Sequence, residues 1–497
     1  MPDVEMRRPA TVDIASEVPL LVGVVGSPED AGTASSALGE AFAGILAELR
    51  GRCPRTPLVL LCALTSDAES AAIRAASEQG IPAIACLRAP HSASEKMLAQ
   101  VAETRVVDGD PRHRIAYVSD LLVVVSSGSA PAELLALADR RRNGEPPAAG
   151  LRNLLAPPDV GPCFVLEGAS LQRFFPPRFA GDKRGERDFT SGLERRSRFN
   201  IDLQSVTEPK EGNALERLRT RTATVTNSLQ RNAHTWQRVL YVLAFIAATV
   251  QVIQIQNALF IRVGAIALAF VVYFFVRRQD YQNRYQDYRA ISEALRVQIV
   301  WSSIGVADGV EESYLPMQQT DLQWIRNLLR VVHFFDRHET SVYGTDVVLN
   351  WVTGQHTYFN DHSQLEARHR DRFGAAALGL GAVSLLASLV ALGFAVVGVN
   401  GPKEWLGVGV LAAWTAVCVA IARSYSRTRA YSENANRYQR MFFVFDTALT
   451  LLKKAHGREA EVRTIASELG RDALAENAEW LLYQRERPIS VVQTDAS

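Results

Sequence analysis

The amino-acid sequence predicts an α/β N-terminal domain with a doubly wound parallel sheet, followed by an all-α membrane region of two transmembrane helical hairpins. Three observations support this fold class. Strand-like and helix-like segments alternate over residues 18–170, which is the pattern of βαβ units. Two pairs of long apolar segments follow, and basic residues flank both pairs on the same side.

The α/β prediction begins with Val18–Val25, a continuous apolar run of the kind that forms a buried parallel strand. Ala34–Arg50 is expected to form the first helix, because apolar residues recur in it at helical spacing. The other expected strands are Pro57–Ala63, Pro82–Leu87, Leu121–Val125 and Cys163–Leu166. The other expected helices are Ala68–Gln79 and Pro131–Asn143.

Four apolar segments approach the length of about 20 residues that a helix needs to cross a hydrocarbon core about 30 Å thick. They form two pairs, Val239–Ile255 with Leu259–Val276 and Ala375–Val399 with Trp405–Ala422. Each connection is short, so each pair is expected to be a helical hairpin. The alternative is that these are core helices of a soluble protein. It is disfavoured because core helices rarely run this long without a polar face.

Arginine residues orient the hairpins. Many basic residues precede or follow the hairpins in the sequence. They are Arg217, Arg219, Arg221, Arg231, Arg238, Arg277, Arg278, Arg284, Arg289, Arg296, Arg368, Arg370, Arg372, Arg423, Arg427 and Arg429. Near the turns within the hairpins there is one basic residue each, Arg262 in the first and Lys403 in the second. The positive-inside rule therefore predicts an integral protein of the inner or plasma membrane, with four transmembrane helices and with both termini in the cytoplasm.

The apolar segments carry no ionisable residue at mid-membrane, which argues against a proton relay or an ion-coupled carrier. A pore, if one exists, would therefore form from several copies of the chain, so we expect a homo-oligomer. The second hairpin is rich in glycine, which permits close helix packing. A weak internal repeat relates Tyr288–Glu293 to Arg429–Glu433, and chance similarity of Arg-rich helices is its alternative.

The expected organisation has seven parts. They are a disordered segment (1–17), an α/β domain (18–170), a linker (171–214), a first hairpin module (215–300), a cytoplasmic helical segment (301–366), a second hairpin module (367–486) and a tail (487–497). Charge is balanced, with 54 Lys and Arg against 53 Asp and Glu, so no nucleic-acid partner is expected. The 5 cysteines have no metal-ligand spacing, and no metal site is expected.

Two Gly/Ser-rich turns after expected strands are the candidate ligand-binding sites. Backbone N–H groups in such turns can bind phosphate, and ligands of open α/β sheets bind beyond the carboxyl ends of the strands. The candidate residues are Gly23, Gly26 and Ser27 in the first turn and Ser126, Ser127, Gly128 and Ser129 in the second. Neither turn carries a full dinucleotide or P-loop pattern, and a tight turn and a helix cap stay open as structural interpretations.

The segment Leu21–Ser27 resembles the opening of SLOG domains, a Rossmann-like superfamily of nucleotide sensors. Gly161–Leu166 and Arg198–Asn200 resemble the end and linker of such domains in bacterial membrane proteins. The helical segments Tyr288–Gln298, Trp324–Arg330 and Ala473–Leu482 are similar to helices of the same proteins, whose membrane part belongs to the SLATT group of two-helix effectors. Where SLOG proteins usually carry Gly-Gly-Thr after the fourth strand, this chain has Ser126–Ser129.

The resemblance implies a membrane-anchored sensor–effector of bacterial anti-phage or stress defence, with the lipid bilayer as one partner. A nucleotide-derived second messenger is the expected ligand, and no resident cofactor is expected. Two alternatives stay open: a structural membrane scaffold with a degenerate α/β domain, and a nucleotide-cleaving enzyme. The enzyme needs a carboxylate near the glycine turns, for which the candidates are Asp30, Asp120 and Glu133. No arrangement of catalytic residues stands out, so the enzyme is the weaker hypothesis.

Overall fold

The computed structural model describes residues 12–26, 35–89, 95–107, 109–126, 161–167, 170–175, 184–253, 258–306, 308–314, 322–336, 344–397, 402–455 and 457–485. The chain divides into two compact units. The first combines Met1–Val225 with Ala290–Val342, and the second combines Thr226–Arg289 with Tyr343–Ser497. Each unit is described by itself.

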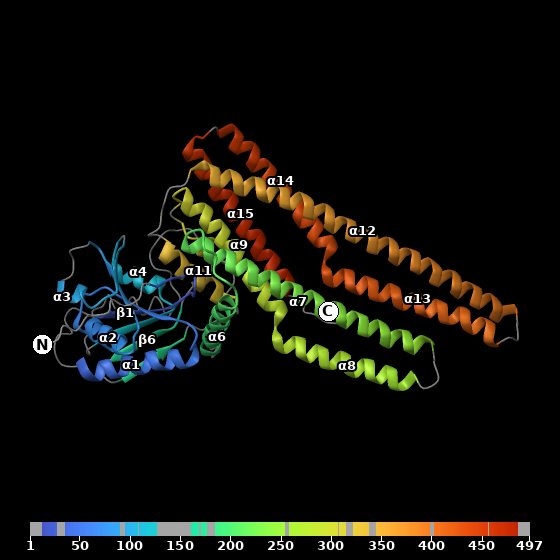
Figure 1. Ribbon diagram of the computed structural model, residues 1–497, viewed down its shortest axis with the longest axis horizontal. Coiled ribbons are helices and arrows are strands. Elements are labelled where there is room, and N and C mark those ends of the chain that lie inside the picture. The colour runs from blue at the N-terminus through green and yellow to red at the C-terminus, as the bar shows by residue number, and fades with distance from the viewer. Residues whose placement is uncertain are drawn as a thin grey trace. The chain divides into compact units, whose positions relative to one another are not determined.

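A seven-stranded sheet forms the centre of the first unit, with the strand order β4-β3-β2-β1-β5-β6-β7 (Figure 1). The strands are β1 (Leu20–Gly26), β2 (Leu58–Cys62), β3 (Ala83–Leu87), β4 (Glu103–Val106), β5 (Leu121–Ser126), β6 (Cys163–Glu167) and β7 (Ser170–Phe174). All neighbours are parallel except β6 and β7, which are antiparallel. The order therefore reverses between β1 and β5, which lie side by side at the middle of the sheet.

Helices cover both faces of this sheet because its central strands are apolar on both sides. Helices α1 (Ser35–Arg52) and α2 (Asp67–Glu78) cover one face, where Val22 of β1 joins Phe42 of α1 in a buried cluster. Helix α4 (Pro111–Val118) covers the opposite face, where Gly23 of β1 lies against Ile115. Short helix α3 (Glu95–Leu98) precedes the edge strand β4. The unit is thus a three-layer α/β structure.

The five strands expected from the sequence are confirmed, with ends that shift by at most three residues. Strands β4 and β7 were not predicted. Strand β4 has the sequence Glu-Thr-Arg-Val, in which only Arg105 is buried, so it lacks the apolar pattern of a strand. As a result, Leu121–Ser126 is the fifth strand rather than the fourth. The expected helix Pro131–Asn143 lies outside the described residues.

The range 171–214, expected to be a linker, contains regular secondary structure. This range holds most of β7, helix α6 (Gly185–Gln204) and the first residue of α7 (Ala214–Ile253). Charged residues of both signs are frequent in α6, but one side of the helix buries Leu193, Phe199 and Leu203. The apolar residues are too sparse to stand out from a charged background, although their spacing places them on one helix face.

Besides the start of α7, three more helical segments of the first unit lie in the described residues. They are the C-terminal part of α9 (Tyr281–Ser303), the short α10 (Val310–Ser313) and α11 (Gln323–Asp336). Helix α11 contacts α6 and α4. Its end is held by Arg105 of β4, whose guanidinium lies 4.6 Å from the ring centres of both Phe334 and Phe335 and donates to the Phe334 carbonyl at 2.5 Å. A cation between two aromatic faces is stabilised by both rings.

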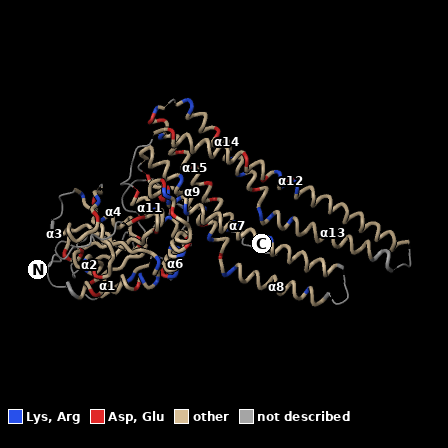
Figure 2. Tube along the Cα trace, in the orientation of Figure 1, with Lys and Arg blue, Asp and Glu red and all other residues tan. Residues whose placement is uncertain are grey.

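The second unit consists of long helices. Besides parts of α7 and α9 it contains α8 (Ala258–Gln279), α12 (Thr345–Val397), α13 (Pro402–Arg429), α14 (Tyr431–Ala455) and α15 (Glu459–Arg485). Four of its helices are long and apolar enough to cross a membrane. In the most apolar stretches of these four, only 17%, 6%, 6% and 6% of the residues are buried. Figure 2 shows that charged residues gather toward one end of these helices, away from the apolar halves.

The four apolar segments predicted from the sequence are confirmed as helices, and their connections at 254–257 and 398–401 lie outside the described residues. Two predicted boundaries fall inside continuous helices. The boundary at 300/301 lies within α9 and the boundary at 366/367 lies within α12. Helix α12 runs without a break from a polar segment into an apolar one, because no residue in it stops the helix.

Both hairpins end in the same way. Asp280 separates α8 from α9 and Ala430 separates α13 from α14, each with φ of 52°. The left-handed conformation of a non-glycine residue is unfavourable, so each break is enforced by the surrounding packing. The proposed sequence repeat has a different register, since it placed Ala290, inside α9, opposite Ala430. The repeat is therefore structural: helix, left-handed residue, helix.

Helix α12 packs against α13 and α14. The first hairpin contacts α13 through Tyr241 of α7, whose hydroxyl lies 3.0 Å from Ser424 Oγ and 2.8 Å from Thr428 Oγ1. Farther along the same helices, Trp414 of α13 donates to Thr249 of α7 at 3.3 Å. These polar contacts between apolar helices fix which faces of α7 and α13 meet.

Candidate ligand site at the carboxyl edge of the sheet

The sheet places side by side the two strand ends at which the predicted turns begin. Gly26 is the last residue of β1 and pairs with Val125 of β5, and Ser126 is the last residue of β5. The remaining candidates Ser27, Ser127, Gly128 and Ser129 lie outside the described residues. Both strands therefore end at one edge of the sheet, at the point where the strand order reverses, which is the usual ligand position in an open α/β sheet.

The two glycines predicted to lie in the first turn are both part of β1, and both are tightly packed. A side chain at Gly23 would place its Cβ 2.1 Å from Ser119 Oγ and 2.7 Å from Ile115 Cγ2. A side chain at Gly26 would place its Cβ 2.4 Å from Ser66 Oγ. Gly23 lies in the middle of β1 and lets α4 approach the sheet, whereas Gly26 lies at the edge and lets the start of α2 approach.

Glu69 of α2 is the acidic residue at this edge, and its side chain is completely buried. Its carboxylate accepts from the Thr65 N–H at 2.8 Å, the Gly26 N–H at 3.3 Å and the Thr65 hydroxyl at 3.3 Å. Its own N–H donates to Ser66 Oγ, the N-cap of α2, at 3.2 Å. Ser66 and Glu69 thus form a variant of the capping box, in which the glutamate reaches past the cap to Thr65 and to the end of β1.

The loop that carries these donors is strained. Leu64, between β2 and Thr65, is buried and has φ of 57°. This left-handed conformation is rare for a bulky residue other than glycine and costs about 1 kcal/mol or more. Backbone strain of this kind clusters at ligand-binding sites, where the surrounding structure enforces it.

Burial raises the pKa of Glu69 from its ordinary value of 4.5 to about 7, because desolvation outweighs the hydrogen bonds from Thr65 and Gly26 and the charge of Arg112. Beneath it, burial raises the pKa of the Cys86 thiol to about 12. The carboxyl group is therefore close to half-protonated near neutral pH, while the thiol stays neutral. A group poised in this way can change its charge when a ligand arrives.

The N–H of Gly26 is already used by Glu69, which bears on what the edge can bind. An ionised Glu69 would repel a phosphate at this turn, whereas a protonated Glu69 is neutral. Because the side chain of Glu69 is completely buried, it acts on this edge through its hydrogen bonds with the Gly26 and Thr65 N–H groups.

Asp120 does not flank this edge, contrary to the hypothesis of a nucleotide-cleaving enzyme. It precedes β5 and therefore lies at the amino end of the sheet, opposite Ser126. Its Oδ2 accepts from Arg196 of α6 at 2.6 Å and from the Leu21 N–H at 2.9 Å, and both charged side chains are 3% exposed. The other two acidic candidates, Asp30 and Glu133, lie outside the described residues.

Glu69 is not among the candidate site residues predicted from the sequence. The signal that marks it is Ser66-Asp67-Ala68-Glu69, a serine followed three residues later by a glutamate at the start of a helix. That pattern predicts only a helix cap. The burial of Glu69 and its contact with Gly26 depend on the packing of α2 against β1, which a local pattern does not show.

The histidines His333, His362 and His369 have structural partners. His333 of α11 lies 2.9 Å from Glu311 Oε1, and both side chains are buried. His362 contacts the Tyr358 carbonyl at 2.9 Å and stacks on its ring, and His369 stacks on Tyr431. Within the residues that the structure describes, no group of three or more His, Cys, Asp or Glu side chains is arranged to hold a metal ion.

No family model, curated protein or solved structure matches this chain.

Proposed function

We propose that the protein is a membrane-anchored sensor–effector. Its Rossmann-like N-terminal domain binds a nucleotide-derived ligand at the carboxyl edge of the sheet, and this binding controls a transmembrane helical assembly. The observation that carries the proposal is the joint presence in one chain of this edge, with the buried carboxyl group of Glu69, and of four apolar helices. The resemblance to SLOG and SLATT proteins adds bacterial anti-phage or stress defence as the biological setting.

The membrane part of the proposal rests on exposed apolar surface. Side chains such as Phe260, Leu378 and Val396 are 81%, 74% and 78% exposed on the four long helices. In water such a continuous apolar surface is unfavourable, and in a bilayer it is not. The basic residues at one end of each helix orient both termini toward the cytoplasm by the positive-inside rule.

The sensor part rests on the carboxyl edge of the sheet. A ligand can shift an assembly only through different affinities for two states, so binding must be coupled to a change in the helices. A ligand can change the backbone conformation of the strained loop at Leu64 and the protonation of Glu69. The scaffold alternative, in contrast, requires no ligand at this edge.

Calorimetric titration of the full chain in detergent with NAD, ADP-ribose and cyclic nucleotides tests the sensor. We expect saturable binding of one of them, weakened about tenfold or more in Glu69→Gln because the amide matches the Gly26 and Thr65 donors less well and disturbs the backbone at this edge. Glu78→Gln is the matched control, because Glu78 lies on the same helix and is exposed. Absence of binding by all of these ligands removes the sensor function and leaves the scaffold.

The effector part has its own test. The bound ligand should release dye from vesicles that contain the protein, and it should leave vesicles with Glu69→Gln intact. A ligand that binds without any release would show that the domain senses but that the helices do not form a pore. Chromatography of the nucleotides after incubation checks the enzymatic alternative, since a cleaving enzyme would yield a new product.

A further inference from the structure

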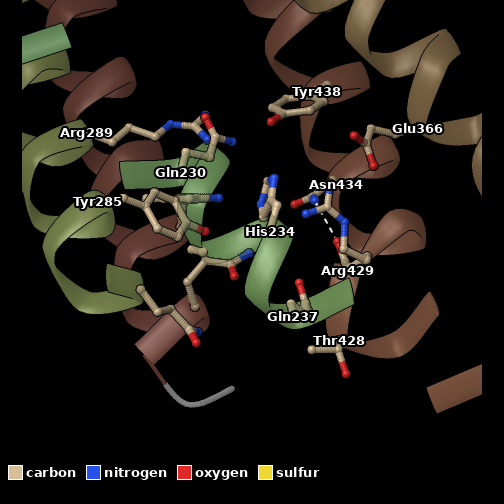
Figure 3. A pocket seen from close by; sticks show the side chains of 14 residues that line it. Gln230, His234, Gln237, Tyr285, Arg289, Glu366, Thr428, Arg429, Asn434 and Tyr438 are labelled. Atoms are coloured by element: carbon tan, nitrogen blue, oxygen red, sulfur yellow. Dashed lines mark hydrogen bonds between the residues drawn. The ribbon is translucent and has the colours of Figure 1, made fainter. Parts of the chain in front are cut away.

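The second unit contains a polar cavity of about 90 Å³ between its helices (Figure 3). Helices α7, α9, α12, α13, α14 and α15 all contribute to its lining. The volume is well below the ~300–1,000 Å³ of pockets that hold a drug-sized ligand. The cavity therefore suits a head group or a small anion and is too small for a whole nucleotide.

The cavity lies where the apolar stretches of the helices end. Its α7 residues, such as Gln237, come just before the apolar segment that begins at Val239. Its α9 and α14 residues come just after the left-handed breaks at Asp280 and Ala430. In a bilayer this level corresponds to the basic flank, where phosphate head groups lie.

Two arginines against one glutamate give the cavity a positive balance. Figure 3 shows the side chains of Arg289 and Arg429 on opposite sides of the cavity, with His234 between them. The guanidinium of Arg289 lies 4.2 Å above the ring of Trp480, which holds it in place. Arginine is the preferred side chain for phosphate because its planar guanidinium offers paired donors.

Three buried polar atoms around the cavity have no hydrogen-bond partner among the described residues: Arg429 Nε, Glu366 Oε2 and Asn434 Oδ1. The orientation of the Asn434 amide is fixed, because its Nδ2 donates to the Arg429 carbonyl at 3.2 Å. The cavity thus leaves one donor and two acceptors unused. Buried polar groups are normally satisfied, so these three atoms call for a bound partner that both accepts and donates.

We propose that this cavity binds a phosphate group that carries a neighbouring hydroxyl or amine. The phosphate oxygens accept from Arg429 and Arg289, and the hydroxyl or amine donates to Glu366 and Asn434. A glycerol-phosphate lipid head group and a small soluble phosphate ester share this chemistry. The inference rests on the proposed placement of the helices in a membrane, but it does not depend on the ligand of the N-terminal domain.

Native mass spectrometry of the full chain in neutral detergent tests the site. Phosphatidylglycerol is titrated first and phosphatidylcholine second, and separate samples receive inorganic phosphate or glycerol 3-phosphate. We expect saturable binding of phosphatidylglycerol and weaker binding of phosphatidylcholine. Binding of glycerol 3-phosphate without phosphatidylglycerol supports the same site with a soluble ligand. Equal binding of both lipids without binding of either phosphate compound overturns the proposal.

Two substitutions decide whether the cavity is responsible. Arg429→Gln should weaken binding about tenfold or more, because it removes a charge-assisted contact inside the cavity. Arg423→Gln removes the same charge from an exposed position on the same helix and should weaken binding about twofold or less. Equal effects of the two substitutions would show that only the overall charge matters and would overturn the site.

Glu366→Gln gives an independent test if Arg429→Gln does not fold. It keeps an acceptor oxygen and removes the negative charge beside the phosphate, so binding of inorganic phosphate, which carries no glycerol hydroxyl or amine to donate to Glu366, should become tighter; weaker binding of inorganic phosphate contradicts the proposal. Alkaline extraction of cell membranes distinguishes a failure of the proposed membrane function from a failure of the cavity proposal. If the wild-type chain is extracted, the membrane part of the proposed function fails. If it stays in the membrane and shows no preference for phosphatidylglycerol or the phosphate compounds, only the cavity proposal fails.

Discussion

The two ends of the same sheet each bury one carboxylate, and the structure treats the two in opposite ways. At the amino end Asp120 pairs with Arg196 at 2.6 Å. At the carboxyl edge Glu69 is held by the neutral donors of Thr65 and Gly26. The first arrangement pairs the carboxylate with an opposite charge, whereas the second leaves a group that gains or loses a proton near pH 7. The difference indicates which end is built for stability and which end is able to respond.

The largest expected effect is at the amino end. Arg196→Ala leaves the buried charge of Asp120 uncompensated and also removes the hydrogen bond from Arg196 to the Pro19 carbonyl, which is 3.1 Å long. We expect the loss of about 3–5 kcal/mol in the free energy of unfolding of the first unit. Hydrogen–deuterium exchange of β1 and β5 amides in the full chain measures it, because exchange reports on the sheet separately from the long helices.

The control for this prediction is Arg198→Ala, at an exposed arginine of the same helix. It should change the free energy of unfolding measured by exchange by less than about 0.5 kcal/mol. The double variant Arg196→Met with Asp120→Leu should recover much of the loss, because neither charge remains buried. If Arg196→Ala exchanges like the wild type, Asp120 is not a structural charge and the contrast between the two ends disappears.

The next largest effect is the pH dependence at the carboxyl edge. The pKa of Glu69 is raised on folding to about 7, so its contribution to stability is fully present below about pH 4.5 and is lost as the pH rises through 7. The loss by pH 8 is about 3 kcal/mol at most. Glu69→Gln should remove this slope, although the amide matches the donors of Gly26 and Thr65 less well and adds a constant destabilisation.

Thermal unfolding midpoints of the full chain between pH 5.5 and 8, followed by tryptophan fluorescence, measure the slope. The first unit contains Trp301 and Trp324, both buried, which report on its unfolding. Glu78→Gln, exposed on the same helix, should keep the wild-type slope. A Glu69→Gln variant that keeps the wild-type slope would mean that another group titrates and that Glu69 is not poised.

The contrast between the two ends shows what the sequence could and could not predict. The buried strands and the four apolar helices were predictable, because continuous apolar runs are a local signal. The roles of Asp120 and Glu69 were not. Asp120 precedes β5 and Glu69 follows β2, so which end each carboxylate occupies depends on strand direction and on the packing of α2 and α6.

The helix within residues 171–214 and the two helix breaks were missed for the same reason. In α6 the residues that hold the sheet are polar: Asn200 bonds both the N–H and the carbonyl of Val18, and Arg196 reaches Asp120. Buried polar residues of this kind look like solvated surface in a sequence. The breaks at Asp280 and Ala430 are likewise invisible locally, because neither residue is a glycine and the left-handed conformation is imposed by packing.

The smallest expected effect separates the cap of α2 from its titratable group. Ser66→Ala removes the acceptor of the Glu69 N–H and should destabilise the first unit by about 1 kcal/mol. The contacts of the Glu69 carboxylate with Thr65 and Gly26 do not involve the Ser66 side chain, so the pH slope should persist. The same fluorescence series measures both quantities. If Ser66→Ala abolished the slope together with the stability, the cap and the carboxylate would act as one structural unit, and the carboxyl edge would resemble the amino end in being built for stability.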